Sequence, residues 1–246
     1  MTQRIALVTG GTGGIGSAIC LALADQGMKV VAGYSNEEKA KAWQQEQKEA
    51  GYDILIQHVD VTSLESCQQA VAEVKEKAGG SIDVLVNNAG ITRDGVFKKM
   101  DWDQWNAVLT TNLDSAFNMT RPVVDDMLDK GYGRIINISS VNGEKGQFGQ
   151  TNYSAAKAGL HGFTKALAQE TARKGVTVNT ISPGYILTPM VAKIAPEIQE
   201  KIVAQIPVGR MGAPEEIGRT VAFLADENAG YITGSNLSIN GGQHMF

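Results

Sequence analysis

Three residues in the middle of the chain have the types and spacing needed to move a proton onto a carbonyl oxygen. Tyr153 and Lys157 stand four positions apart, and Ser140 precedes Tyr153 by thirteen residues. Residues at i and i+4 share one face of a helix, so we expect the Lys157 ammonium beside the Tyr153 phenol. A free phenol titrates near pH ~10, and a fixed cation beside it favours the phenolate and lowers its pKa. The pair is therefore a candidate general acid and base.

Ser140 follows the apolar run from Arg134 to Ile138, which is typical of a buried strand. Its hydroxyl would point to the same carbonyl oxygen. A tyrosine four residues before a lysine is by itself more often part of a solvated helix face. The interpretation therefore depends on the elements that surround these residues.

Composition narrows the class of protein. The chain has 246 residues, of which 43% are hydrophobic, and a formal net charge of −4. This size fits one domain over residues 1–246. Without a block of like charges, neither nucleic acid nor a membrane surface is an expected partner, which leaves a small-molecule substrate. Cys20 and Cys67 have no metal-ligand spacing and predict no metal site, only buried thiols in a reducing cytoplasm. We find neither a signal-peptide pattern nor an apolar run of membrane-spanning length.

Short apolar runs alternate with longer amphipathic stretches. The runs are nearly continuous in apolar character, as expected for parallel strands that are covered on both faces. The alternation predicts an α/β fold, a single doubly wound Rossmann domain with a seven-stranded parallel sheet and helices on both faces. The expected strands are 5–9, 29–33, 54–59, 84–87, 134–138, 176–181 and 237–239, and the expected helices are 15–26, 37–50, 64–78, 103–130, 152–174 and 214–226. Residues 186–206 interrupt the alternation beyond a strand end, so we expect them to form a small substrate lid.

A glycine-rich turn joins the first strand to the first helix. Its sequence, Thr9 to Gly16, has the context that a phosphate-binding turn requires, because the helix N-terminus supplies amide donors and the positive end of a dipole. The glycines allow a tight turn and a close approach of the backbone to pyrophosphate. The expected contacts are Gly10, Thr12, Gly13, Gly14, Ile15 and Gly16.

The end of the second strand indicates which nicotinamide cofactor is bound. A carboxylate there would hold a ribose 2′-hydroxyl and repel a 2′-phosphate, but this strand ends without an acid. The hydroxyl of Ser35 and the cation of Lys39 suit a phosphate, which favours NADPH. Against this, Glu37 and Glu38 lie nearby and Lys39 is also what a solvated helix face would carry.

With the glycine turn, Asn88-Ala89-Gly90, Asn112, Ser140, Tyr153 and Lys157 in order, the chain resembles the short-chain dehydrogenase/reductase family over essentially its whole length. Within the family it is most similar to the acetoacetyl-CoA reductases of polyhydroxyalkanoate synthesis, through 88–94 and 139–153. It is nearly as similar to the 3-oxoacyl-acyl-carrier-protein reductases.

The resemblance implies roles for particular residues. Tyr153 would protonate the substrate oxygen, Ser140 would polarise the carbonyl, and Lys157 would lower the pKa of Tyr153 and hold the nicotinamide ribose. Asn112 would kink its helix and position a water that passes protons to Lys157. Implied cofactor contacts beyond the glycine turn are Asp60 and Val61, Asn88 to Gly90 with Ile91 and Thr92, and Pro183, Gly184, Ile186 and Thr188. Implied substrate contacts, besides Ser140 and Tyr153, are Asp94, Gln147, Phe148, Gly149, Gln150 and Tyr185.

Several of these residues have an ordinary structural explanation as well. Asp60 and Asn112 could be cap or turn residues, since Asp and Asn favour such positions. Phe148 and Tyr185 could anchor loops.

The activity that the resemblance implies is NADPH-dependent reduction of acetoacetyl-CoA to an (R)-3-hydroxyacyl-CoA. Three alternatives stay open: a reductase of acyl-carrier-protein thioesters, with Lys130, Arg173 and Lys174 as a basic docking surface; a sugar or steroid dehydrogenase; and a non-catalytic nucleotide sensor. The resemblance also implies a homotetramer, in which the apolar C-terminal pair Met245 and Phe246 would be buried at an interface.

Overall fold

The computed structural model describes residues 3–189 and 191–245; Met190 of the expected lid and the C-terminal Phe246 lie outside this description. Within the described residues, seven parallel strands form one sheet in the order β3-β2-β1-β4-β5-β6-β7. The strands are β1 (Ile5–Val8), β2 (Lys29–Tyr34), β3 (Leu55–His58), β4 (Val84–Asn87), β5 (Gly133–Ile138), β6 (Val176–Pro183) and β7 (Asn236–Ile239). The predicted fold class and all seven predicted strands are confirmed.

Helices follow the strands as predicted, with three differences. The main helices are α1 (Gly14–Asp25), α2 (Glu37–Glu49), α3 (Leu64–Ala78), α4 (Trp102–Leu109), α5 (Ser115–Lys130), α6 (Val141–Lys145), α7 (Thr151–Thr171), α8 (Pro196–Val203) and α9 (Pro214–Ala225). The expected helix 103–130 is interrupted by a π-helical turn, η2 (Thr110–Asp114). The short helices α6 and α8 were not predicted, since five and eight residues are too few to show a clear periodicity.

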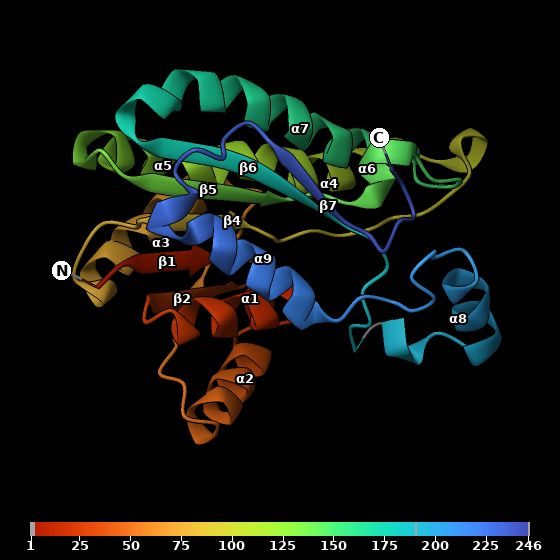
Figure 1. The fold of residues 1–246 in the computed structure, drawn as a ribbon, viewed down its shortest axis with the longest axis horizontal. Helices are drawn as coiled ribbons and strands as arrows, with labels where there is room; N and C mark the ends of the chain where they lie inside the picture. The colour runs from red at the N-terminus through yellow and green to blue at the C-terminus, as the bar shows by residue number, and fades with distance from the viewer. Residues whose placement is uncertain (1–2, 190, 246) are drawn as a thin grey trace.

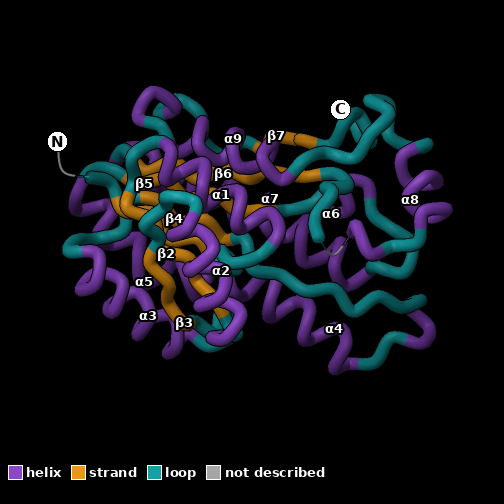
Figure 2. Tube along the Cα trace, turned by 90° about the horizontal axis from the view of Figure 1, so that it is seen from below, coloured by secondary structure: helices purple, strands orange, loops and turns teal. Residues whose placement is uncertain are grey.

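Helices cover both faces of the sheet, and each face has its own apolar core. One core joins the sheet to α3, α5 and α7, and the other joins it to α1, α2 and α9. Successive residues of one strand enter different cores: Leu7 and Leu85 belong to the first, and Val8 and Val86 to the second. Burial on both faces explains why these strands have continuous apolar sequences. Figure 2 shows the strands enclosed between the two helical layers.

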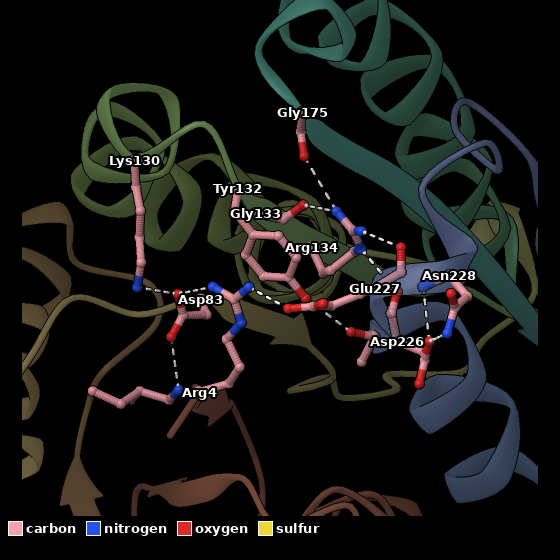
Figure 3. A network of polar contacts seen from close by, with 12 residues as sticks. Arg4, Asp83, Lys130, Tyr132, Gly133, Arg134, Gly175, Asp226, Glu227 and Asn228 are labelled. Carbon is pink, nitrogen blue, oxygen red and sulfur yellow. Dashed lines mark hydrogen bonds and ion pairs between the residues drawn. The ribbon is translucent and has the colours of Figure 1, made fainter. Parts of the chain in front are cut away.

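A polar network holds together the edge of the sheet at which the strands begin (Figure 3). The Tyr132 ring lies between two guanidinium groups, with the Arg4 carbon 3.6 Å and the Arg134 carbon 4.4 Å from the ring centroid. Asp83 is buried and accepts hydrogen bonds from the Ile5 backbone amide and from Lys130. Arg134 donates to the carbonyl oxygens of residues 133, 175, 226 and 227. These contacts tie β1, β4 and β5 to the segment after α9.

The segment between β6 and α9 stands to one side of the sheet (Figure 1). It contains a 3₁₀ turn, η4 (Val191–Lys193), and α8, none of whose described side chains is buried. An isolated parallel bridge between Ile186 and Gly212 closes its base. No helix in the described part of the chain is both long and apolar enough to cross a membrane.

Candidate active site

Tyr153, Lys157 and Ser140 line one pocket of about 390 Å³ at the carboxyl ends of the central strands. Ser140 follows β5, and the other two residues lie on the first turns of α7. The pocket is also lined by Ile15, Asn88, Gly90, Ile91, Thr92, Arg93, Ile138, Ser139, Pro183 and Gly184. The glycine-turn helix and the three candidate catalytic residues therefore border the same space.

Lys157 is held from below by the end of β5. Its side chain is buried, and Nζ donates to the Ile138 carbonyl oxygen at 2.8 Å. The same nitrogen lies 5.6 Å from the centroid of the Tyr153 ring. Burial lowers the pKa of Lys157 to about 8, because an ammonium without solvent around it is penalised. The lysine is thus poised to gain or lose a proton near neutral pH.

The pKa of Tyr153 differs from the sequence prediction. We expected Lys157 to lower it, but the pKa is raised above its ordinary value, because burial penalises the phenolate. A hydrogen bond with Ser140 acts in the lowering direction, and the negative charge of Asp94 acts in the raising direction. Lys157 directs its bond to Ile138 and is itself desolvated. In the protein alone, Tyr153 is therefore held as a proton donor.

Ser140 is positioned as the N-cap of α6. Its backbone is extended, and Oγ accepts a hydrogen bond from the Asn142 amide at 3.1 Å. Because that amide occupies an acceptor position, the hydroxyl proton remains available for donation into the pocket. The short unpredicted helix thus orients one of the predicted residues.

Asn112 lies in the π-helical turn η2 and is buried. Its Nδ2 donates to the carbonyl oxygens of Val108, at 2.8 Å, and Ile91, at 2.9 Å, while Oδ1 accepts from the Ile91 amide at 3.2 Å. The irregular turn and the side-chain bond to Val108 account for the expected break in the helix. A Cβ on Gly90 would come within 2.5 Å of Asn112 Oδ1 and 3.5 Å of Lys157 Nζ, so this approach requires glycine.

The glycine turn has the geometry of a phosphate cradle. Gly10 and Gly14 have positive φ angles of 61° and 44°, and a Cβ on Gly16 would meet the Gly10 carbonyl oxygen at 2.1 Å. The N-cap of α1, Gly13, makes no side-chain capping bond, and the first turn of α1 has no acid. The amides at this helix N-terminus are therefore free to bind an anion, and the residues fit a dinucleotide.

Residues expected along the rest of the cofactor lie in varied surroundings. Asn88 supports the glycine turn, because its Nδ2 donates to the carbonyl oxygens of Thr9 at 2.9 Å and Gly10 at 3.2 Å. Asp60 accepts hydrogen bonds from both the amide and the hydroxyl of Thr62. This contact fits the alternative explanation of Asp60 as a turn residue. The Val61 side chain is buried in the core, and Thr188 lies beside Gly14. Ala89 packs against a core, Thr12 is partly exposed, and Ser35 and Lys39 are exposed.

On the substrate side, the loops after β4 and α6 form one wall. Gln150 donates to Asp94 at 2.9 Å and accepts from Asn142 at 2.9 Å, and the Gly95 amide donates to the Gly149 carbonyl oxygen at 2.8 Å. Gln147 accepts a bond from Lys145. Phe148 is 85% exposed and anchors no loop.

Tyr185 and Ile186 do not line the pocket of Tyr153. Both border a second cavity of about 100 Å³, whose lining also includes Ile206 at the end of the expected lid. Ile186 is 5% exposed and belongs to a core. The expected contact of Ile186 with the nicotinamide stays a prediction.

Three pocket residues were missed by sequence reasoning: Arg93, Ile138 and Ser139. Ile138 contributes through its carbonyl oxygen, for which a sequence has no signal. Ser139 and Arg93 are direct neighbours of predicted residues in the chain. In the described residues, no group of three or more His, Cys, Asp and Glu side chains is placed to hold a metal ion.

Comparison with known proteins places this geometry in context. Residues 10–244 match a family model described as enoyl-(acyl carrier protein) reductase. The chain is 58% identical to an acetoacetyl-CoA reductase of Cupriavidus necator over 100% of both chains, and 55% identical to one of Allochromatium vinosum over 98% of this chain and 99% of the other. It is 45% identical to a 3-oxoacyl-[acyl-carrier-protein] reductase of Escherichia coli over 98% of both.

Proposed function

Since this chain belongs to the short-chain dehydrogenase/reductase family, we propose that it reduces acetoacetyl-CoA, a short 3-oxoacyl thioester, to (R)-3-hydroxyacyl-CoA with NADPH. The observation that carries the proposal is the convergence of Ser140, Tyr153 and Lys157 in a pocket bordered by the glycine-turn helix. These groups supply proton transfer and polarisation of a carbonyl at one place, next to a cradle for a dinucleotide.

The protein's contribution is to bind the ketone oxygen and to protonate it. When bound, the nicotinamide cofactor supplies the hydride. As negative charge grows on the ketone oxygen, the Ser140 hydroxyl donates a hydrogen bond to it and stabilises that charge. Tyr153 then donates its proton, which its raised pKa keeps in place beforehand.

In this proposal, Lys157 and Asn112 help to return a proton to Tyr153. Lys157, with its pKa of about 8, stabilises the Tyr153 phenolate while it exists and then returns a proton to the phenolate oxygen. Asn112 Oδ1, which accepts one bond from Ile91, retains acceptor capacity for a water beside Lys157. Pro183 and Gly184 complete the wall on which a nicotinamide would rest.

NADPH is favoured by the surroundings of the second strand end. Ser35 and Lys39 are both exposed there, and Asn36 is engaged in capping α2 through the Lys39 amide. Glu37, the acid that could repel a 2′-phosphate, forms an ion pair with Lys41 at 2.6 Å. Lys39 makes no ion pair with another described residue, so its ammonium is available for the phosphate.

A thioester of coenzyme A is favoured over one of acyl carrier protein. The chain is 58% identical to the acetoacetyl-CoA reductase of C. necator but 45% identical to the carrier-protein reductase of E. coli. The carrier-protein thioester remains the second candidate, because that relative also aligns over 98% of both chains.

The proposal also covers the cellular location and the oligomeric state of the enzyme. We place the enzyme in the cytoplasm, in polyhydroxyalkanoate synthesis, in keeping with its two free, buried cysteines. Residues 186–206 act as a lid over a single domain. A homotetramer would cover the exposed rings of Phe117, Phe223 and Tyr231 and the side chain of Met245. Sedimentation as a monomer would contradict the tetramer.

A substrate and cofactor comparison tests the activity. The purified protein is assayed with acetoacetyl-CoA and acetoacetyl-acyl-carrier-protein, each with NADPH and NADH. We expect kcat/KM to be at least ~10-fold higher for acetoacetyl-CoA with NADPH than for the other combinations. Preference for the carrier-protein thioester would establish the second candidate, and no oxidation of NADPH with either thioester would contradict both.

A further inference from the structure

Behind the pocket, a row of hydrogen-bonded polar side chains, here called the Ser139 file, connects α7 to the far edge of the sheet. It consists of Ser139, His161, Ser182, Asn236 and Glu144. Ser139 Oγ donates to the Lys157 carbonyl oxygen at 2.9 Å. His161 Nε2, one turn further along α7, lies 2.9 Å from Ser139 Oγ and 3.3 Å from Ser182 Oγ. The file continues through Asn236 to Glu144 on α6.

The acceptors in this file fix which atom carries each proton. The Ser139 hydroxyl faces a carbonyl oxygen, which can only accept, so it donates there. Asn236 turns its Nδ2 toward the Glu144 carboxylate, so its Oδ1 accepts from the Ser182 hydroxyl at 2.8 Å. Each serine has then used its single proton. The hydrogen between His161 Nε2 and both serine oxygens must therefore belong to the histidine.

We propose that His161 is a positioning residue for catalysis: its Nε2–H group bridges Ser139 and Ser182 and keeps the Ser139 hydroxyl on the Lys157 backbone. The proposal rests on the proposed reductase activity. His161 touches neither the substrate nor the cofactor, and it acts through Ser139.

The position of Ser139 explains why one hydrogen bond there matters. Ile138 holds the Lys157 ammonium through its carbonyl oxygen, Ser139 holds the Lys157 carbonyl group, and Ser140 reaches Tyr153. Three consecutive residues at the end of β5 thus clamp the catalytic turn of α7. Without a donor from His161, the Ser139 oxygen loses its incoming bond and the hydroxyl is free to rotate away from Lys157.

The charged groups around the imidazole suit a neutral donor. Burial lowers the pKa of His161, the charge of Glu144 raises it, and that of Lys165 lowers it. Glu144 is engaged on Oε1 by Asn236 and Ser238, so its charge is held at the end of the file. A neutral His161 with its proton on Nε2 satisfies both serine oxygens.

Three variants test the role in catalysis. His161→Gln keeps an N–H donor near the position of Nε2, and His161→Leu removes the donor at similar size. Thr164→Val is the matched control. Thr164 is buried one turn further along α7, where its hydroxyl accepts from Asn137 at 2.8 Å and contacts Thr180, outside the Ser139 file. Each variant is characterised by thermal unfolding, by kcat and KM, and by the isotope effect with NADPH deuterated at the transferred hydrogen.

We expect His161→Leu to lose ~10- to 100-fold in kcat, because a displaced catalytic group slows chemistry, with both KM values little changed. The isotope effect should rise in His161→Leu, and His161→Gln should restore most of kcat. Thr164→Val should lose thermal stability with near wild-type kcat. Wild-type kcat in His161→Leu, or equal losses of kcat in His161→Leu and Thr164→Val, would overturn the proposal.

A second measurement does not depend on activity. The chain has three histidines, so ¹⁵N-histidine labelling with His161→Gln as the assignment control isolates the His161 signals. We expect a neutral imidazole protonated on Nε2, and protonation on Nδ1 alone would overturn the proposal. A wild type that binds NADPH but reduces neither thioester would contradict the proposed function, and the tautomer would still decide the donor assignment.

Discussion

The Lys157 ammonium nitrogen lies 5.6 Å from the centroid of the Tyr153 ring, yet its hydrogen bond goes to the Ile138 carbonyl oxygen at 2.8 Å. The lysine is thus stored beneath the phenol, buried and without a carboxylate partner among the described residues. Its pKa falls to about 8, while that of Tyr153 rises. Burial therefore shifts the two pKa values in opposite directions, and each shift favours the neutral form of its group.

A buried ammonium without a carboxylate partner should lower the free energy of unfolding. We expect Lys157→Met to raise the free energy of unfolding of the cofactor-free enzyme by roughly 1–3 kcal/mol at pH 7, while turnover is lost. Denaturant unfolding at pH 7 measures it. A destabilised Lys157→Met would show that the amine stabilises the fold.

The pH dependence of that difference follows from linkage. The folded pKa of Lys157, about 8, lies below the unfolded value of 10.5. Below pH 8 the lysine is charged in both states and the folded state bears the full penalty. As pH rises from 8 to 10.5, the unfolded state holds more protons, so wild-type stability increases relative to Lys157→Met. The advantage of the variant should therefore shrink over this range.

The charge of Asp94 also acts on Tyr153. Because this charge raises the pKa of Tyr153, Asp94→Asn should lower it, while an asparagine can still accept the bond from Gln150. The proton donor is then lost at lower pH, and the basic limb of the kcat profile for reduction should move to lower pH. An unchanged profile would mean that Asp94 does not act on the phenol.

The glycine turn offers a matched pair of substitutions. Gly16→Ala places a Cβ 2.1 Å from the Gly10 carbonyl oxygen, whereas a Cβ on Gly13 meets nothing within 4 Å. We expect Gly16→Ala to lose about 1–3 kcal/mol of stability and Gly13→Ala to stay within about 0.5 kcal/mol. Thermal unfolding without cofactor compares them. Equal stability of the two variants would contradict the packing of this turn.

Cofactor choice can be tested on neighbouring lysines of one helix. Lys39→Ala should raise the KM for NADPH by about 10-fold and leave that for NADH unchanged, since only NADPH has the 2′-phosphate. Lys41→Ala is the control, because Lys41 is paired with Glu37. If Lys41→Ala weakened NADPH binding more than Lys39→Ala, the phosphate site would have to be assigned elsewhere.

The sheet, its order of helices and the pocket's main residues could be predicted because their signals are local. Apolar runs such as Val84 to Asn87 mark strands, and the spacing of Tyr153 and Lys157 places both on one helix face. Parallel strands then bring the residues after each strand to one edge of the sheet.

The rest depends on three-dimensional surroundings. The balance of burial and charge that sets the pKa of Tyr153 is a property of the folded pocket, and so is the carbonyl of Ile138 that captures Lys157. Ile186 and Tyr185 follow Gly184 in the chain, but the turn after β6 directs them to another cavity. Spacing in the sequence cannot reveal such a turn.

The central claim is that the Tyr153 hydroxyl delivers the proton to the substrate. Replacement by phenylalanine removes that oxygen alone, and kcat of Tyr153→Phe for acetoacetyl-CoA with NADPH is the most direct measurement, paired with the Kd for NADPH. We predict a loss of ~10²- to 10⁴-fold in kcat with NADPH binding preserved. A Tyr153→Phe enzyme that reduced acetoacetyl-CoA at a near wild-type rate would contradict the account.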